Sequence, residues 1–279
     1  MTGILYIVAT PIGNLADITG RAVEVLGEVD LIAAEDTRHS ARLMQAHGIS
    51  TPMLAYHDFN EARGAAGIID RLLQGRNIAL ITDAGTPLVS DPGYRLVRMA
   101  RESGVRVVPV PGPSAVIAAL SCAGLASDRF TFEGFLPAKE AARMAKLKLL
   151  EKEQRTMIFY EAPHRILACL GDMLAVFGEA REVVLARELT KNFETVINGS
   201  LARLLEVVTN DTDQQKGEMV LVVAGAEDVK EDEAQLRHIM IVLLEELPLK
   251  QAASLASKIT GCKKNRLYEL GLDLSGKKD

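Results

Sequence analysis

The sequence predicts an α/β fold with two α/β domains, residues 1–125 and 126–228, and a small helical domain over residues 229–279. Three observations predict it. Short apolar runs alternate with helical patterns through residue 123, which favours a mostly parallel sheet. Turn and aromatic residues then interrupt the pattern over Ala126–Lys139. A charged stretch finally separates the last apolar run from two helical segments, as a linker does.

Several apolar runs have the length and composition of buried strands. They are Ile4–Ala9, Leu31–Ala34, Ile78–Ile81, Val105–Val110, Thr156–Tyr160, Glu182–Ala186 and Glu218–Ala224. Segments with helical spacing lie between many of these runs or follow them. They are Ile18–Val25, Ala41–Gln45, Glu61–Gln74, Tyr94–Glu102, Ser114–Ala123, Lys139–Gln154, Leu236–Leu247 and Leu249–Ile259, the last two being split by Pro248.

The composition is that of an ordinary globular protein, with 48% hydrophobic and 25% charged residues. The net charge of -5 does not by itself predict nucleic-acid binding, although a local basic patch can still contact phosphates. Cys122, Cys169 and Cys262 lack metal-ligand spacing and are expected to be reduced, so we expect no metal site. We predict a cytoplasmic protein without a membrane helix, because no apolar stretch approaches ~20 residues and the N-terminal run is typical of a strand.

One loop, Thr82–Gly93, is the first candidate for a ligand site. It reads TDAGTPLVSDPG and follows the buried run Ile78–Ile81. Loops after other predicted strands also carry turn or charged residues, at Thr10–Leu15, Glu35–Arg38 and Pro109–Ala115. Ligands of open α/β sheets bind at the carboxyl ends of strands. The first half contains neither G-x-G-x-x-G nor G-x-x-x-x-G-K-[ST], which argues against nicotinamide and nucleoside-triphosphate sites.

The motifs LYIVATPIGNLADIT, AAEDTR, ITDAGTPLVSDPG, PVPGPSA, FYEAPHR and KGEMVLVVAG resemble the tetrapyrrole methylase superfamily, the class III S-adenosylmethionine methyltransferases. The resemblance extends from Gly3 to about Leu272. ATPIGNL, EDTR and TDAGTPLVSDPG resemble the bacterial branch that methylates the ribose 2′-hydroxyl of a cytidine in the decoding region of 16S rRNA. ATPIGN stands where members acting on porphyrin precursors usually carry G-x-G-x-G. The alternatives are a methyltransferase of the same fold acting on a tetrapyrrole or another RNA, and a non-enzymatic RNA-binding assembly factor.

The resemblance implies an S-adenosylmethionine site between the two α/β domains. It also implies 16S rRNA or the 30S subunit as partner, and a homodimer. The implied cofactor residues are Pro11, Asp83, Ala84, Gly85, Leu88, Ser114, Ala115, Tyr160, Glu161, Ala162, Leu189, Gly217, Glu218 and Met219. Asp83 can pair with the cofactor's ammonium group, and Leu88 and Tyr160 can cover an apolar face of adenine.

Candidate catalytic residues follow the second predicted strand. Glu35, Asp36 and Arg38 are the best acid–base or substrate-positioning groups there. The alternative interpretation of Glu35 and Asp36 is helix capping, because carboxylates also favour a helix N-terminus.

Basic side chains at other strand ends and in the tail are candidates for RNA contact. Arg165, Arg187 and Lys191 follow predicted strands of the second domain, with internal ion pairs as the alternative. Lys139, Arg143 and Lys146 share one helical face, which can equally be a solvated face. A further group, Lys263, Lys264 and Arg266, lies in a segment that resembles a helix-turn-helix. A helix pair packing on a dimer partner is the alternative there.

Overall fold

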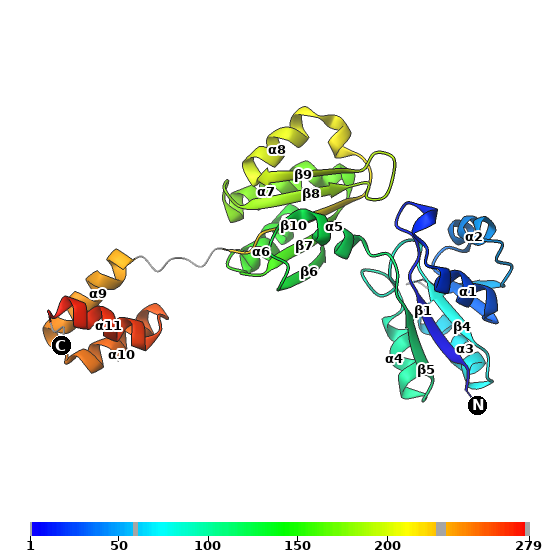
Figure 1. Cartoon of the computed structure of the whole chain (residues 1–279), viewed down its shortest axis with the longest axis horizontal. Coiled ribbons are helices and arrows are strands. Elements are labelled where there is room, and N and C mark those ends of the chain that lie inside the picture. Colours follow the sequence, from blue (N-terminus) through cyan, green and yellow to red (C-terminus); the bar gives the residue numbers. More distant parts are fainter. Residues whose placement is uncertain (1, 58–60, 227–232, 277–279) are drawn as a thin grey trace. The chain divides into compact units, whose positions relative to one another are not determined.

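The computed structural model describes residues 2–57, 61–226 and 233–276. It divides into two compact units, Met1–Ala224 and Gly225–Asp279 (Figure 1). The first unit contains two five-stranded sheets, and the second is helical. The α/β class and the helical C-terminal region predicted from the sequence are therefore confirmed. Part of the predicted linker, together with the predicted boundary at 228/229, lies outside the described residues.

The first sheet is entirely parallel, with strand order β3-β2-β4-β1-β5. Its strands are β1 (Ile4–Val8), β2 (Leu31–Ala34), β3 (Met53–Ala55), β4 (Ile78–Ile81) and β5 (Arg106–Val110). All residues of β2 and β4 are buried, as expected of strands covered on both faces. Since every strand runs the same way, the loops after β1, β2, β4 and β5 emerge at one edge of the sheet.

Helices cover both faces of the first sheet. α1 (Gly20–Glu28) and α2 (Thr37–Ala46) pack on the face that carries Val8. α3 (Glu61–Leu73) and α4 (Tyr94–Glu102) pack on the opposite face, which carries Leu5. Alternate strand residues thus feed two separate apolar clusters, which is the period-2 pattern of a strand.

The second sheet is mixed, with strand order β6-β7-β10-β8-β9. Its strands are β6 (Phe130–Phe135), β7 (Thr156–Glu161), β8 (Glu182–Arg187), β9 (Thr195–Ser200) and β10 (Met219–Val223). β6 and β7 are parallel, whereas β10 runs antiparallel to both β7 and β8, and β8 runs antiparallel to β9. The sequence did not identify β3, β6 or β9.

Helices pack on both faces of the second sheet. α6 (Glu140–Leu150), α7 (Ile166–Phe177) and α8 (Leu201–Asn210) cover one face, and α5 (Ala115–Ala123) packs on the other. The sequence did not identify α7 or α8. α5 directly follows the last strand of the first sheet yet packs on the second, so the two sheets share one compact unit. A domain boundary near residue 125 stays a prediction.

The C-terminal unit consists of α9 (Glu233–Glu246), α10 (Leu249–Thr260) and α11 (Lys264–Leu274). Its own apolar cluster includes Met240, Ala253 and Leu267. Gly261 ends α10 with a left-handed φ of 78°, the usual role of glycine after a helix. No helix among the described residues is long and apolar enough to cross a membrane.

Candidate functional site

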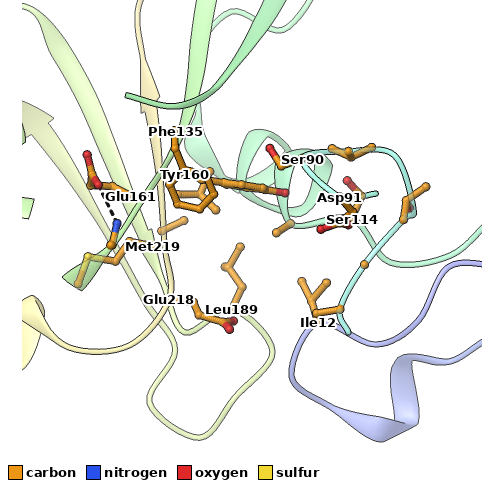
Figure 2. Close-up of a pocket in the computed structure, with 18 of the residues that line it drawn as sticks. Ile12, Ser90, Asp91, Ser114, Phe135, Tyr160, Glu161, Leu189, Glu218 and Met219 are labelled. Atoms are coloured by element: carbon orange, nitrogen blue, oxygen red, sulfur yellow. Dashed lines mark hydrogen bonds between the residues drawn. The ribbon is translucent and has the colours of Figure 1, made fainter. Parts of the chain in front are cut away.

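A cavity of about 340 Å³ opens in the first unit, lined by loops that follow strands of the first sheet and by residues of the second sheet (Figure 2). Its size falls at the lower end of the range of small-molecule sites, roughly 300–1,000 Å³. The lining residues are Ile12, Ala84, Gly85, Thr86, Val89, Ser90, Asp91, Ser114, Ala115, Phe135, Tyr160, Glu161, Ala162, Pro163, Ala186, Leu189, Glu218, Met219 and Val220.

Three loops of the first sheet form one wall of the cavity, and hydrogen bonds tie them together. Thr10 and Gly85 exchange backbone hydrogen bonds of 2.9 and 3.1 Å. The Thr86 hydroxyl donates to the carbonyl of Pro113 at 2.9 Å. The loops after β1, β4 and β5 are therefore held in one fixed arrangement at the sheet edge.

The loop after β4 contains two non-glycine residues with left-handed backbone, Leu88 (φ 73°) and Ser90 (φ 67°). Such conformations are uncommon and recur at functional sites. Leu88 packs against the apolar cluster of the first sheet, while Val89 and Asp91 line the cavity. Leu88, which was predicted to cover the ligand, is half-buried against this cluster and lies outside the lining of the cavity.

The aromatic side chains of the second sheet form the opposite wall. Tyr160 makes edge contacts with Phe132 and Phe135, with ring centroids 5.0 and 5.5 Å apart. Phe135 is 55% exposed although it lines the cavity. Burial, reinforced by the negative charge of Asp91, raises the pKa of Tyr160 to about 12. Tyr160 therefore stays neutral at physiological pH.

Glu161 is buried, and its carboxylate is bound by neighbouring groups of the chain. Its Oε1 accepts the backbone N–H of Ala162 at 2.8 Å and pairs with Nε of Arg165 at 3.2 Å. The guanidinium of Arg165 also donates to the carbonyls of Leu136 and Pro137. The RNA contact predicted for Arg165 is not supported, because these internal partners engage its guanidinium.

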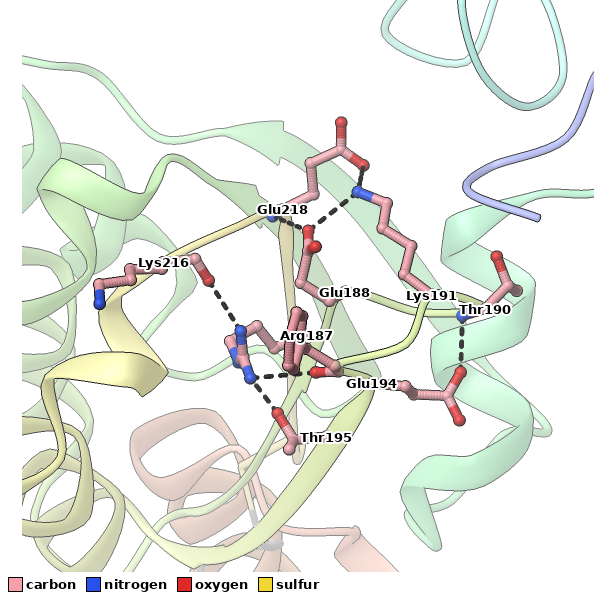
Figure 3. A network of polar contacts seen from close by, with 9 residues as sticks. Arg187, Glu188, Thr190, Lys191, Glu194, Thr195, Lys216 and Glu218 are labelled. Atoms are coloured by element: carbon pink, nitrogen blue, oxygen red, sulfur yellow. Dashed lines mark hydrogen bonds and ion pairs between the residues drawn. The ribbon is translucent and has the colours of Figure 1, made fainter.

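Arg187 is likewise an internal residue, with only 7% of its surface exposed (Figure 3). Its guanidinium donates to Oγ1 of Thr195 (3.0 Å), Oε1 of Gln214 (3.2 Å) and the carbonyls of Phe193 (3.0 Å) and Lys216 (3.2 Å). Burial and these internal partners argue against the RNA contact predicted for Arg187. Lys191, in the same network, bridges Glu188 and Glu218.

The predicted catalytic group lies at the end of β2, outside the lining of the cavity. Asp36 caps α2 by accepting the backbone N–H of Arg38 at 2.8 Å, and its carboxylate pairs with the Arg38 guanidinium at 3.2 Å. The hydrogen bond from the Arg38 side chain lowers the pKa of Asp36, with help from the Arg38 backbone N–H. Capping, the alternative raised by the sequence, is what the structure shows for Asp36. Glu35 accepts the backbone N–H of Asp83 at 3.4 Å.

Most residues predicted to bind the cofactor line the cavity. Those that do are Ala84, Gly85, Ser114, Ala115, Tyr160, Glu161, Ala162, Leu189, Glu218 and Met219. Pro11, Asp83, Leu88 and Gly217 are outside its lining. Asp91 and Phe135 were missed, although Asp91 lies in the loop singled out from the sequence. The presence of a second Asp in that loop could have identified Asp91 from the sequence.

The three basic residues of the C-terminal unit that were predicted to contact RNA lie where α11 begins. Lys263 precedes the helix, and Lys264 and Arg266 lie in its first turn, all three exposed. The basic face proposed for Lys139, Arg143 and Lys146 is not uniformly exposed. Arg143 is buried and pairs with Asp172 at 2.6 Å. Lys146 of that face pairs with Glu133 at 2.7 Å. The described residues contain no group of His, Cys, Asp and Glu side chains able to hold a metal ion.

Comparison with known proteins gives the same architecture. The methyltransferase CobJ superposes with a TM-score of 0.60 at 18% identity, covering 81% of this chain and 95% of that one. A diphthine synthase gives 0.59 at 15% identity, covering 80% and 90%. At these identities the likeness shows the fold alone.

Sequence relatives are much closer. The chain is 56% identical over 278 residues to ribosomal RNA small subunit methyltransferase I of Pseudomonas aeruginosa, covering 99% of both chains. It is 56% identical over 275 residues to the protein of that name from Escherichia coli O157:H7, covering 98% of this chain and 96% of the relative. Residues 230–275 match the RsmI C-terminal HTH domain, and residues 4–205 match the Tetrapyrrole (Corrin/Porphyrin) Methylases. The chain belongs to the tetrapyrrole methylase family of methyltransferases.

Proposed function

We propose that the chain transfers a methyl group from S-adenosylmethionine to the ribose 2′-hydroxyl of a cytidine in the decoding region of 16S rRNA. The observation that carries the proposal is the cavity, which both sheets line where the loops after β1, β4 and β5 converge. The relatives at 56% identity are named as small-subunit ribosomal RNA methyltransferases, and the similarity covers 99% and 96% of their length. The helix-turn-helix match of the C-terminal unit supports a nucleic-acid substrate.

The residues of the cavity fit S-adenosylmethionine in chemistry. Ile12, Val89, Tyr160 and Leu189 offer apolar surface suited to adenine, and backbone groups of Ala84 and Gly85 can bind its polar edge. The carboxylate of Asp91 suits a ligand that carries an ammonium and a sulfonium cation, whereas the carboxylate of Glu218 is paired with Lys191 at 3.0 Å. When bound, the cofactor supplies the electrophilic methyl group.

The described residues contribute mainly by positioning. An ordered cavity that holds both reactants in line can supply much of the rate enhancement. Asp36 is a weak candidate for the general base, because its lowered pKa and its pairing with Arg38 make it a poor proton acceptor. We propose that the neutral Tyr160 and the carboxylate of Asp91 orient the bound groups. The family resemblance further supports a homodimer that works in the cytoplasm on the 30S subunit or its rRNA.

A transfer assay tests the proposed function. The purified protein is incubated with methyl-labelled S-adenosylmethionine and, separately, with 30S subunits, naked 16S rRNA or a porphyrinogen. We expect label in the ribosomal RNA and, after digestion, in 2′-O-methylcytidine. Label in the porphyrinogen alone would overturn the RNA assignment, and cofactor binding without transfer to any acceptor would favour an RNA-binding assembly factor.

Two matched variants test the cavity itself. Asp91→Asn removes a charge from the lining, so we expect the affinity for S-adenosylmethionine to fall by about tenfold. Asp83→Asn makes the same chemical change outside the lining and should leave that affinity within about threefold of wild type. An equal effect of both substitutions, measured by calorimetric titration, would count against the placement of the ligand.

A further inference from the structure

The loop between β8 and β9, residues 188–194, is held in an unusual backbone conformation. Glu188 (φ 51°) and Thr190 (φ 67°) are both left-handed without being glycine. Such a backbone conformation is strained in a residue other than glycine and persists only where surrounding contacts fix it. The loop also presents Leu189 to the cavity. The conformation of the loop therefore sets the position of Leu189 in one wall of the cavity.

Hydrogen bonds within the loop supply part of the restraint. The backbone N–H of Thr190 donates to Oε2 of Glu194 at 2.6 Å, and the N–H of Lys191 donates to the carbonyl of Glu188 at 3.0 Å. The guanidinium of Arg187 donates to the carbonyl of Phe193 at 3.0 Å. The loop is thus an ordered element (Figure 3).

The ammonium of Lys191 joins this loop to the start of β10. Its Nζ donates to Oε1 of Glu188 at 2.9 Å and to Oε2 of Glu218 at 3.0 Å. Glu188 and Glu218 also exchange hydrogen bonds, since the N–H of Glu218 donates to the Glu188 carboxylate and the N–H of Glu188 to the Glu218 carbonyl. Burial alone would lower the pKa of Lys191, but the two carboxylates raise it. Lys191 is therefore fully charged at neutral pH.

The stem of Lys191 packs on the opposite wall. A Cβ built on Gly13 would lie 2.5 Å from Cγ and 2.9 Å from Cε of Lys191, and 2.9 Å from the Thr190 hydroxyl. The backbone at Gly13 therefore lies directly against Lys191, and a larger residue at this position would have to displace the Lys191 stem. The preceding residue, Ile12, lines the cavity. One side chain thus contacts the loop of Ile12 through its stem and fixes Glu218 through its ammonium.

We propose that Lys191 is a positioning residue for the ligand of the cavity. It holds the wall of Leu189 and Glu218 against the wall of Ile12, and so sets the affinity of the site for S-adenosylmethionine. The proposal rests on the proposed function, because it takes that cofactor as the ligand. It replaces the RNA contact predicted for Lys191, whose ammonium is bound by two carboxylates of the chain.

Binding measurements on the full-length protein test the proposal. Lys191→Met keeps a stem but removes the ammonium, and we expect the dissociation constant for S-adenosylmethionine to rise by about tenfold. Lys191→Arg can still bridge the two carboxylates and should bind within about threefold of wild type. Lys216→Met is the matched control, because Lys216 forms an exposed pair with Asp213 at 2.7 Å and does not line the cavity. It should bind like wild type.

A second pair of variants tests the contact with Gly13. Gly13→Ala should weaken binding because the new methyl group displaces the Lys191 stem. In the background of Lys191→Ala, which removes most of that stem, Gly13→Ala should have a smaller effect. Equal and additive losses would overturn the contact as the basis of positioning.

The outcomes separate the two proposals. A wild-type protein that does not bind S-adenosylmethionine would overturn the proposed function and this inference with it. A wild type that binds, with Lys191→Met within about twofold of it, would overturn this inference alone. Loss of binding in Lys191→Met without rescue in Lys191→Arg, at unchanged melting temperature for both, would also count against it.

Discussion

The backbone N–H of Asp36 donates to Oδ1 of Asp83 at 3.1 Å and thereby joins the loops that follow β2 and β4. The N–H of Asp83 in turn donates to Glu35 at 3.4 Å. The three acidic residues form one structural junction at the edge of the first sheet. This junction accounts for the position of Asp83 outside the lining of the cavity.

Removal of the Asp83 carboxylate should therefore reduce stability. We expect Asp83→Ala to lower the free energy of unfolding by about 1–3 kcal/mol, because the N–H of Asp36 loses a charged acceptor. Urea denaturation measures the change. A variant as stable as wild type but unable to bind S-adenosylmethionine would return Asp83 to the ligand site.

A methyl group at Gly217 should be more costly than one at Gly124. Both glycines are left-handed, with φ of 84° and 68°. A Cβ on Gly217 would clash with Cδ of Glu188, whereas one on Gly124 meets nothing within 4 Å. We expect Gly124→Ala to cost about 1–2 kcal/mol from backbone strain. Gly217→Ala should cost about 1–3 kcal/mol more, because Glu188 must move. Equal losses in denaturant melts would contradict this.

The buried pair of Arg143 and Asp172 offers a test of its own. Nε of Arg143 donates to the Asp172 carboxylate at 2.6 Å, and the guanidinium also reaches the carbonyl of Ala138. Asp172→Ala leaves a buried charge unpaired and should destabilise by about 3–5 kcal/mol. Arg143→Met combined with Asp172→Leu removes both charges and should lose less unfolding free energy than Asp172→Ala does. If the loss of unfolding free energy in the double variant equals the sum of the losses in its two single variants, the pair is not the source of the effect.

Tyr160 should be among the last tyrosines to ionise. Its pKa is raised to about 12 by burial and by Asp91, against an ordinary value of 10.0. Because the folded-state pKa is raised, its contribution to stability is complete below pH 10 and is lost as the pH rises toward 12. Ultraviolet titration of wild type minus Tyr160→Phe should show this late step. A difference step near pH 10 would mean that Tyr160 is not held in a buried site.

The basic start of α11 should contact phosphates if the C-terminal unit binds RNA. The triple variant of Lys263→Gln, Lys264→Gln and Arg266→Gln should weaken RNA binding and reduce the salt dependence of log K by about 0.7 for each phosphate that is no longer neutralised. Lys148→Gln combined with Lys152→Gln changes two exposed lysines of the first unit and serves as control. An unchanged salt slope in the triple variant would assign these side chains to packing or solvation.

The strands that the sequence predicted were those with continuous apolar runs. Runs such as Ile78–Ile81 are buried on both faces and carry a strong signal. β9 reads TVINGS and is only partly buried, so its composition resembles a loop. β6 contains Gly134 at φ 66° and an irregular register, so its sequence resembles a turn rather than a regular strand. α7 is apolar around most of its surface, so its helical period is weak.

The candidate site was predictable at the level of loops rather than side chains. Parallel strands bring their carboxyl ends together, which is why loops far apart in the sequence were correctly grouped. The direction of each side chain depends on backbone angles that composition does not reveal. Leu88, with a left-handed φ, packs half-buried against the apolar cluster of the first sheet, whereas Val89 and Asp91 line the cavity. Similarly, the partners of Arg187 come from segments that only the folded chain brings together.

The order of the first sheet has a consequence for how the chain is made. β1 precedes the other strands of the first sheet in the chain, yet it pairs Leu5 with Ile78 of β4 and with Val107 of β5. Its apolar residues must therefore wait, unpaired, until most of the first sheet has been translated. Such long-range parallel pairing is slow and exposes a nascent chain to aggregation. The first sheet can therefore be completed only after Val110 of β5 has emerged, and a pause before that point would prolong the vulnerable period.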